Sequence, residues 1–139
     1  MGSPLNALQD WRVLIVDDHF DNIIVAQTTL EHYGAQIYIA ENGEAGLALL
    51  GSICPHLILM DLSMPMMNGW ELIAHIREHR PDLADVPIIA VTAHAMHGDR
   101  EKALAVGFDG YIAKPYDIHD LVPAILDVIA SKEGSGGNT

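Results

Sequence analysis

The sequence predicts an α/β fold, a doubly wound (βα)5 three-layer sandwich in which helices cover both faces of a parallel sheet. Short segments rich in valine and isoleucine alternate with longer segments whose apolar residues recur at helical spacing. The short segments are mostly continuous apolar runs, which is typical of parallel strands buried on both faces. Five strands that are each followed by a helix, joined by right-handed crossovers, build this sandwich.

The expected strands are the apolar runs that lie between turn signals. They cover Trp11–Val16, Gln36–Ala40, Leu57–Met60, Val86–Val91 and Gly110–Ala113. Turns between neighbouring elements are indicated by the dipeptides Tyr33-Gly34, Asn42-Gly43, Asn68-Gly69, Arg80-Pro81 and Val106-Gly107.

A helix after each strand is predicted by apolar residues that share one helical face. The stripes contain Ile23, Ala26 and Leu30; Ala45, Leu49 and Leu50; Leu72, Ile73 and Ile76; Ala103, Leu104 and Val106; and Ile118, Leu121, Val122, Ile125, Leu126 and Ile129. Pro123 leaves two alternatives for the last helix. The helix begins near Asp120, so that the proline lies in its first turn, or it begins near Asp117 and kinks.

The length of 139 residues suits one domain with a sizeable core. We expect this domain to cover residues 11–131, between an N-terminal extension over 1–10 and a flexible, glycine-rich C-terminal tail over 132–139. The first residues lack the basic and apolar segments of a signal peptide, and no apolar run is long enough to cross a bilayer. Because the single cysteine, Cys54, excludes an internal disulfide, we expect a cytoplasmic location.

The charge of the chain restricts its partners. The sequence has 19 acidic residues against 7 basic ones, which gives a formal net charge of -12 at pH 7. Such an acidic balance disfavours nucleic acid and anionic membranes as partners. It favours a cation as ligand, or a protein partner with a basic patch.

Charged and hydroxyl side chains follow four of the five expected strands. Asp17 and Asp18 follow the first strand, Asp61 the third, Thr92 the fourth and Lys114 the fifth. Ligands of an open α/β sheet bind beyond this carboxyl edge, so these side chains are expected to meet. Three carboxylates predict a hard divalent cation. Mg²⁺ suits them because it binds one or two carboxylates and keeps waters and phosphate oxygens as its other ligands.

One carboxylate of this group is also a candidate nucleophile, because carboxylates form aspartyl-phosphate intermediates. Asp61 is best placed, since it follows the central strand between the acidic pair and the side that carries Thr92 and Lys114. We expect Lys114 to pair with one phosphoryl oxygen and the Thr92 hydroxyl to bond another.

Four motifs, VLIVDD, LILMDLSMPMMNG, AVTA and YIAKP, occur in this order. Over residues 11–131 they resemble the receiver domain of two-component response regulators, most of all the receivers of hybrid histidine kinases and single-domain regulators. The resemblance implies a flavodoxin-like fold with strand order 2-1-3-4-5. It also implies a phosphoryl donor, either a histidine kinase or a histidine phosphotransfer protein, and a downstream protein target.

The resemblance assigns metal-binding roles to individual residues. Asp61 matches the phosphoacceptor and, together with Asp18, the direct Mg²⁺ ligands. The backbone carbonyl of Ser63 matches the third protein ligand, and Asp17 matches the acid that holds a metal-bound water. Mn²⁺ is expected to substitute for Mg²⁺.

The resemblance also implies a switch and a docking surface. Thr92 and Lys114 match the groups that are drawn toward the phosphate, and Tyr111 matches the aromatic residue whose rotamer follows Thr92. The helix around Phe20, Ile24 and Gln27, together with the loop after Pro115, matches the surface on which phosphohistidine helices dock. Since the sequence carries no DNA-binding motif, output is expected through protein contacts.

Three other functions compete with this one. A hydrolase with an aspartate nucleophile typically carries a second acid two residues later, where this sequence has Ser63. A flavin carrier needs a phosphate-binding loop after the first strand, where Asp17 and Asp18 would repel the phosphate. A pseudo-receiver that binds partners without phosphorylation stays open, as does the choice between a stand-alone regulator and one domain of a hybrid kinase.

Several nearby residues have open roles. Ser63 and His94 flank the position where a hydrolytic water would enter, so the lifetime of the phosphoryl group is open. The methionines at 64, 66 and 67 either offer an adaptable partner surface or fill space beside the site. The other histidines show no tetrahedral metal spacing and are interpreted as surface or interface residues: His19, His32, His56, His75, His79, His97 and His119.

Overall fold

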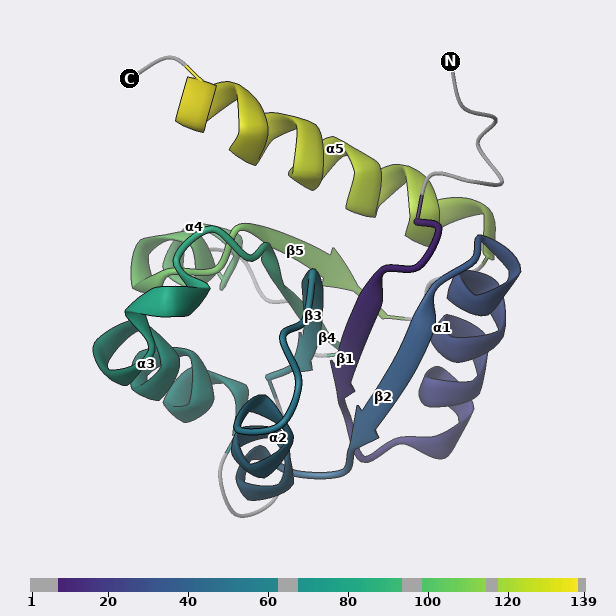
Figure 1. The fold of residues 1–139 in the computed structure, drawn as a ribbon, viewed down its shortest axis with the longest axis horizontal. Helices are drawn as coiled ribbons and strands as arrows, with labels where there is room; N and C mark the ends of the chain where they lie inside the picture. Colours follow the sequence, from purple (N-terminus) through teal and green to yellow (C-terminus); the bar gives the residue numbers. More distant parts are fainter. Residues whose placement is uncertain (1–7, 63–67, 94–98, 115–117, 138–139) are drawn as a thin grey trace.

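Strands and helices alternate along the chain, as predicted (Figure 1). The computed structural model describes residues 8–62, 68–93, 99–114 and 118–137. The elements are β1 (Arg12–Val16), α1 (Phe20–His32), β2 (Gln36–Ala40), α2 (Gly43–Leu50), β3 (Leu57–Asp61), α3 (Gly69–His79), η2 (Pro81–Leu83), β4 (Ile88–Thr92), α4 (Asp99–Val106), β5 (Gly110–Ala113) and α5 (Ile118–Gly137).

The five strands form one parallel sheet in the order β2-β1-β3-β4-β5, which confirms the predicted topology. Val16 of β1 lies opposite Met60 of β3, and Thr92 of β4 lies opposite Ala113 of β5. The residues at and just after these positions therefore reach the same carboxyl edge of the sheet.

Helices cover both faces of the sheet (Figure 1). On one face, α1 and α5 enclose a buried apolar cluster that includes Val13 and Ile125. On the other face, α2, α3 and α4 enclose a second cluster that includes Leu14 and Ile76. Every residue of β3 and β4 is buried. This two-sided burial explains why their sequences are continuous apolar runs rather than alternating ones.

β4 begins two residues later than predicted. The N–H of Val86 donates to the carbonyl oxygen of Leu83 at 3.1 Å and closes the turn after η2, so Val86 lies outside the sheet. Pro87 has no N–H to give to a neighbouring strand. The strand starts at Ile88 and extends one residue past the predicted end, to Thr92. Similarly, β3 includes Asp61, and β1 starts at Arg12.

α5 contains Pro123 in its interior. The alternative in which this helix begins near Asp120 is therefore wrong, because the helix begins at Ile118, close to the other predicted start at Asp117. Pro123 is exposed, so water can reach the carbonyl that lacks an N–H partner there. No described helix, α5 included, is long and apolar enough to span a membrane.

The ordered structure extends beyond both predicted ends of the domain. Leu8, in the predicted extension, is fully buried in the cluster beneath α1 and α5, and the N–H of Asp10 donates to Gly34 at 2.9 Å. At the other end, α5 continues to Gly137, six residues beyond the predicted domain end at 131. Residues 130–133, Ala-Ser-Lys-Glu, contain no strong helix breaker, which accounts for the helix as far as Glu133, before the glycines of the tail.

Two asparagines from the predicted turns begin helices. The Asn42 side chain accepts a hydrogen bond from the N–H of Ala45 at 2.8 Å at the start of α2. Asn68 and Glu71 form a reciprocal capping box at the start of α3, with distances of 3.0 and 3.2 Å. This cap fixes the beginning of α3 beside the end of β3, which carries Asp61.

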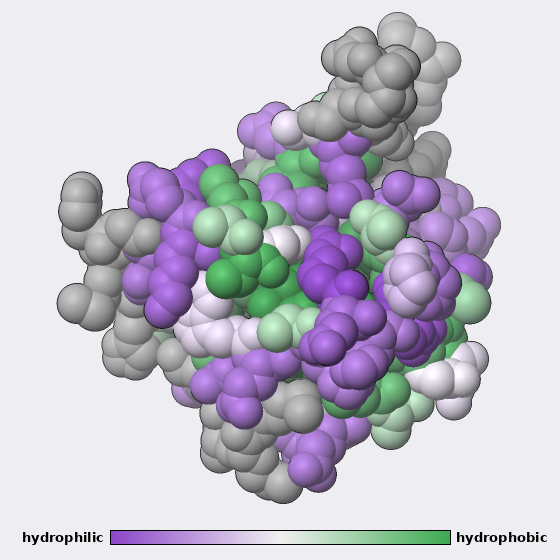
Figure 2. Space-filling view, turned by 90° about the vertical axis from the view of Figure 1, so that its left-hand side faces the viewer, coloured by the Kyte–Doolittle hydropathy of each residue, from purple (hydrophilic) through white to green (hydrophobic). Residues whose placement is uncertain are grey.

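The surface carries a few large apolar side chains among hydrophilic ones. On the side of α3 and α4, hydrophilic residues surround an apolar area (Figure 2). Among the described residues, Phe20 and Ile24 of α1 are 72% and 42% exposed, and Leu104 and Val106 of α4 are 43% and 42% exposed. These exposed apolar groups on α1 and α4 are candidates for protein contacts.

Candidate functional site

Two buried aspartates lie side by side at the carboxyl edge of the sheet. Asp61 is the last residue of β3, and its side chain is 1% exposed. Asp17 directly follows β1, and its N–H donates to the carbonyl of Ala40 at 3.0 Å, which continues the pairing with β2. Because β1 and β3 are neighbours, the sheet itself brings the two carboxylates together. Burial of two like charges is costly unless opposite charges are near.

Lys114 supplies a positive charge to these carboxylates. Its side chain is 3% exposed, and its Nζ atom lies 2.9 Å from Oδ2 of Asp17 and 3.4 Å from Oδ2 of Asp61. The N–H of Lys114 donates to the carbonyl of Thr92 at 2.7 Å, which holds the start of this loop against β4. Within the described residues, no acceptor meets hydrogen-bond geometry with Nζ. The ammonium is thus held by charge and retains its capacity to donate to an incoming anion.

Thr92 and Tyr111 lie on the neighbouring strands. Thr92 ends β4 and is 2% exposed. Tyr111 in β5 is half-buried, and its buried hydroxyl oxygen has no hydrogen-bond partner among the described residues. Burial is the main cause that raises the pKa of Tyr111, with a smaller contribution from the charge of Asp99. A buried hydroxyl without a partner is uncommon, which indicates a side chain that is not locked by this packing.

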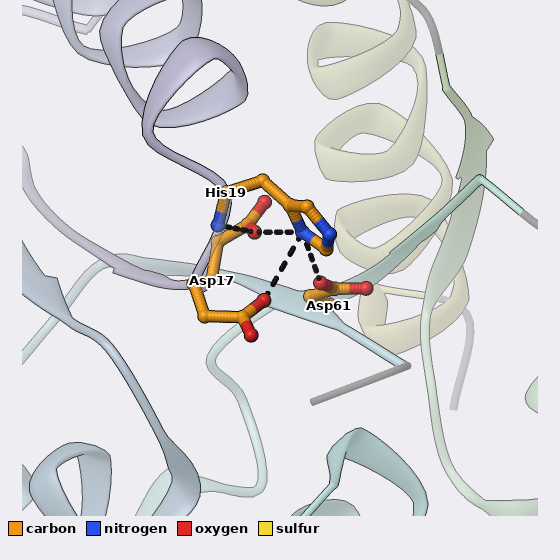
Figure 3. Close-up of side chains that lie close together, drawn as sticks. Asp17, His19 and Asp61 are labelled. Atoms are coloured by element: carbon orange, nitrogen blue, oxygen red, sulfur yellow. Dashed lines mark hydrogen bonds and ion pairs between the residues drawn. The ribbon is translucent and has the colours of Figure 1, made fainter. Parts of the chain in front are cut away.

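The ring of His19 lies between the carboxylates (Figure 3). Its Nδ1 atom is 3.1 Å from Oδ1 of Asp17, 3.1 Å from Oδ1 of Asp18 and 3.2 Å from Oδ2 of Asp61. The backbone N–H of His19 also donates to Oδ1 of Asp17 at 2.9 Å. His19 lies at the surface, as predicted, with its side chain 52% exposed, but its ring also contacts the acidic site, which was not predicted from the sequence.

The acids raise the pKa of His19. The hydrogen bond to Asp17 is the largest cause, and the charges of Asp18 and Asp17 add to it, against the opposing effects of burial and of Lys114. Since a carboxylate oxygen only accepts, Nδ1 carries the proton in these contacts. When the ring is also protonated at Nε2, its positive charge helps to balance the three carboxylates.

The donor atoms at this edge fit a divalent cation. One ligand atom each from Asp17, Asp18, His19 and Asp61 lies within 4.8 Å of all the others. The set combines three carboxylates with a net negative charge, which hard cations favour, and Asp18 is open to solvent, so waters can complete the coordination.

Most of the residues predicted to meet at this edge lie close together in the structure. The structure brings Asp17, Asp18, Asp61 and Lys114 together, and Thr92 ends at the same edge. The predicted ligand Ser63 lies outside the described residues, as do His94 and the methionines at 64, 66 and 67. His19 was missed because metal spacing was sought among histidines alone. The signal was its position directly after the acidic pair.

A separate cavity of 380 Å³ lies at the opposite, amino-terminal edge of the sheet. Its lining includes Trp11, His56, Pro87 and Lys132. These residues precede the strands or come from the end of α5, far along the sheet from Asp61, so this cavity does not belong to the acidic site.

The fold and this acidic edge define the chain as a member of a known family. The chain matches the model of the response regulator receiver domain over residues 13–126, so it belongs to the receiver domains of two-component systems. These domains are signalling modules that act with histidine kinases or phosphotransfer proteins.

Individual relatives agree with this membership. An uncharacterized 14.6 kDa protein of Leptolyngbya boryana is 38% identical over 118 residues, which cover 85% of this chain and 89% of that protein. The sensor protein GacS of Pseudomonas syringae pv. syringae is 36% identical over 128 residues, 91% of this chain. The chain spans only 14% of the length of that kinase.

A solved structure shares the fold over nearly its whole length. The receiver domain of the sensor histidine kinase PA1611 from Pseudomonas aeruginosa superposes with a TM-score of 0.76 at 30% identity. The match covers 87% of this chain and 98% of that domain, which was solved with a magnesium ion coordinated in its active site cleft.

Proposed function

We propose that the chain accepts a phosphoryl group on Asp61, in a Mg²⁺-dependent reaction, from the phosphohistidine of a histidine kinase or a histidine phosphotransfer protein. The observation that carries the proposal is the position of Asp61. Its buried carboxylate lies between a cluster of metal-type ligands and the ammonium of Lys114, whose Nζ atom is 3.4 Å away. This environment offers positive charge on both sides of an incoming phosphoryl group.

Asp17, Asp18 and Asp61 would hold the metal ion, with the carbonyl of Ser63 as a further predicted ligand. Mg²⁺ is the proposed ion, and Mn²⁺ the proposed substitute, because the donors are mainly carboxylates. When bound, the ion neutralises negative charge on the phosphoryl oxygens. The magnesium ion in the related PA1611 receiver supports this choice.

In the transfer step, a carboxylate oxygen of Asp61 attacks phosphorus while the phosphorus–nitrogen bond of the donor breaks. The donor imidazole keeps the electron pair of that bond, so no oxidant or other reactant is needed. Lys114 would exchange its ion pairs with Asp17 and Asp61 for a contact with a phosphoryl oxygen. The protein therefore contributes positioning and charge rather than an acid or base.

Phosphorylation would shift the protein between two states. Thr92 ends the strand next to β3, so its hydroxyl is suited to bond a phosphoryl oxygen. Tyr111, whose buried hydroxyl lacks a described partner, would turn inward when Thr92 moves. The surface of β4, α4 and β5 would then change and present a different face to a downstream protein target.

Intact-protein mass spectrometry tests the proposal. With acetyl phosphate and Mg²⁺, we expect one added phosphoryl group, and we expect none with EDTA or in Asp61→Asn. The matched control is Asp85→Asn, which removes an exposed acid away from the site and should be phosphorylated normally. A folded wild-type protein that never gains the group would contradict the proposal and favour a pseudo-receiver that acts only through its surface.

A further inference from the structure

Two histidines lie side by side near the end of α3. His75 and His79 are four residues apart, and side chains at this spacing lie on the same face of a helix, one turn apart. Their ring centroids are 4.5 Å apart, with an angle of 45° between the ring planes. His79 is exposed and His75 is half-buried, so solvent reaches both residues. The helix therefore presents two imidazoles together at the surface.

A carboxylate accompanies this pair of histidines. Glu78 lies directly before His79, and its Oε2 atom is 3.8 Å from Nε2 of His79. The Glu78 side chain is 76% exposed, so it can turn toward an ion bound at that nitrogen. The residues 75–79, His-Ile-Arg-Glu-His, have the H-x-x-E-H spacing, and two histidines one helical turn apart bind zinc in metalloproteases.

The two rings need little movement to chelate one ion. Nitrogens that bind Zn²⁺ at about 2.0–2.1 Å stand roughly 3.4 Å apart around it. Each ring nitrogen lies away from its ring centroid, so rotation about the last side-chain torsion can turn one nitrogen of each ring toward a shared point. This torsion has a broad energy minimum in histidine, so the rotation costs little. His75 and His79 are thus nearly arranged as a bidentate ligand.

We propose that His75 and His79, with Glu78 as a third ligand, form a surface site at the end of α3 that binds Zn²⁺. Imidazole nitrogens suit zinc and other late transition ions, and two histidines with one glutamate are an established set of zinc ligands. Water would complete such an open site. The net charge of -12 favours the approach of a cation.

This zinc site is separate from the acidic site at the carboxyl edge. α3 begins at Gly69, beside Asp61, and runs back along the sheet, so His79 lies about 15 Å along the helix axis from that start. Mg²⁺ favours oxygen donors and retains its waters, so it should compete poorly for two imidazoles. The inference does not depend on phosphorylation of Asp61, and it adds a second ion of different chemistry to the molecule.

Isothermal titration calorimetry with Zn²⁺ tests the proposal in a mildly alkaline buffer that contains excess Mg²⁺. The alkaline pH keeps imidazole neutral, and Mg²⁺ competes for the acidic site. We expect His75→Gln and His79→Gln each to weaken Zn²⁺ binding roughly tenfold or more, and Glu78→Gln to weaken it severalfold. Glutamine is a good helix former, so these variants should fold. His32→Gln, at the exposed end of α1, is the matched control and should bind Zn²⁺ like the wild type.

Nuclear magnetic resonance with Cu²⁺ locates the ion independently. Cu²⁺ is paramagnetic and broadens nearby amide signals, and nitrogen ligands bind it more tightly than Zn²⁺. With less than one equivalent of Cu²⁺, we expect broadening centred on residues 75–79 in the wild type and in His32→Gln. This broadening should disappear from α3 in His79→Gln, whose spectrum without metal also shows whether the variant is folded.

Equal Zn²⁺ affinity in folded His79→Gln and His32→Gln, or Cu²⁺ broadening that stays away from α3, would overturn the inference. Unchanged Zn²⁺ affinity in Glu78→Gln would overturn the assignment of Glu78 as a ligand. Both measurements are made without a phosphoryl donor, so their failure is distinct from failure of the proposed phosphoacceptor function.

Discussion

Lys114 lies 2.9 Å from Asp17 and 3.4 Å from Asp61, which explains how a buried strand can end in acids that have no base beside them in the sequence. The compensating charge comes from the residue directly after β5, which is three strands from β1 and two strands from β3 in the sheet. A buried carboxylate is tolerated only when it is paired or bonded in this way. A cation bound by the acids, or a phosphoryl group bound beside Lys114, would change the balance of charge at this site. Both ligands would therefore interact with the same few side chains.

His56, at the opposite edge of the sheet, makes stability depend on pH. Its Nδ1 atom accepts a hydrogen bond from the N–H of Arg12 at 2.9 Å. Burial, and to a lesser extent the charge of Arg12, lowers the pKa of His56 from 6.5. The unfolded chain therefore takes up this proton near pH 6.5 while the folded protein resists it. The contribution of His56 to the free energy of unfolding is present above pH 6.5 and decreases as the pH falls toward the lower pKa of the folded state.

We expect His56→Asn to lose less stability than the wild type when the pH is lowered through 6.5. The asparagine side-chain oxygen can accept the same bond from Arg12 but does not titrate. Urea unfolding above and below this pH measures the free energy of unfolding of both proteins. The carboxylates contribute equally to the pH dependence of the two proteins, so the difference between them isolates the contribution of His56. A His56 imidazole that titrates in the folded protein at or above 6.5, followed by NMR, would contradict the account.

At the residue scale, sequence reasoning succeeded where topology decides position. Asp17, Asp61 and Lys114 follow strands, and the carboxyl ends of parallel strands meet at one edge. It failed for His19, because the direction of that side chain depends on the conformation of the short link between β1 and α1. The position of His19 directly after the acidic pair places it near the site, but residue spacing does not report which way its side chain points.

The junction between β3 and α3 needs a glycine for a steric reason. Gly69 is the first residue of α3, and a Cβ atom there would collide with the carbonyl oxygen of Asp61 and lie 2.9 Å from Cα of Leu62. Both neighbours are backbone atoms and cannot move without displacing the end of β3. The close approach thus ties the start of α3 to the position of Asp61.

We expect Gly69→Ala to lower the free energy of unfolding by about 1–3 kcal/mol and to slow phosphorylation of Asp61. Urea unfolding and the acetyl phosphate reaction measure the two effects. Gly51→Ala is the matched control, because Gly51 has a φ of -76° and a Cβ there would meet only Ala48 O at 3.3 Å. Equal stability of the two variants would show that the crowding at Gly69 is unimportant.

The exposed face of α1 is the proposed docking surface for the phosphoryl donor. Phe20 and Ile24 are 72% and 42% exposed, and α1 begins next to Asp17 and Asp18. We expect Ile24→Ala to weaken docking by about 1 kcal/mol, which slows transfer from a phosphorylated histidine phosphotransfer protein roughly fivefold. Phosphorylation by acetyl phosphate should be unchanged. Leu104→Ala, on α4, is the control, and an equal effect on transfer in both variants would contradict the assignment to α1.

Element boundaries were harder to predict than the elements themselves. The run from Val86 to Val91 is apolar throughout, but the turn bond from Val86 to Leu83 removes its first residue from the sheet. Pro123 was compatible with two helix starts, and the choice depended on where α5 lies against β5 and α1 rather than on its own sequence.

At the scale of the whole molecule, the two edges of the sheet differ. At the amino-terminal edge, Arg77 donates to the carbonyl of Gly107 at 2.7 Å and to Asp109 at 3.2 Å. Asp109 also accepts from the N–H of Ile88 at 2.9 Å and from Lys132 at 2.9 Å. These bonds join α3, β4, β5 and α5. The carboxyl edge instead gathers like charges and a Tyr111 hydroxyl without a described partner, which suits it to change when charge is added.

The fold class could be predicted from the sequence, because few architectures are compatible with continuous apolar runs that alternate with amphipathic helical segments. The strand order did not follow from those runs, because several orders bury them equally well. It was implied by the resemblance to receiver domains and is confirmed by the sheet.

The central claim is that Asp61 carries the phosphoryl group, and chemical location of that group tests it most directly. After phosphorylation with Mg²⁺ and acetyl phosphate, borohydride reduces an aspartyl phosphate to homoserine, which peptide mass spectrometry can locate. We predict conversion at Asp61 alone, dependent on Mg²⁺ and absent without acetyl phosphate. Conversion at Asp17 or Asp18 instead, or at no aspartate in a protein that has gained a phosphoryl group, would contradict the account.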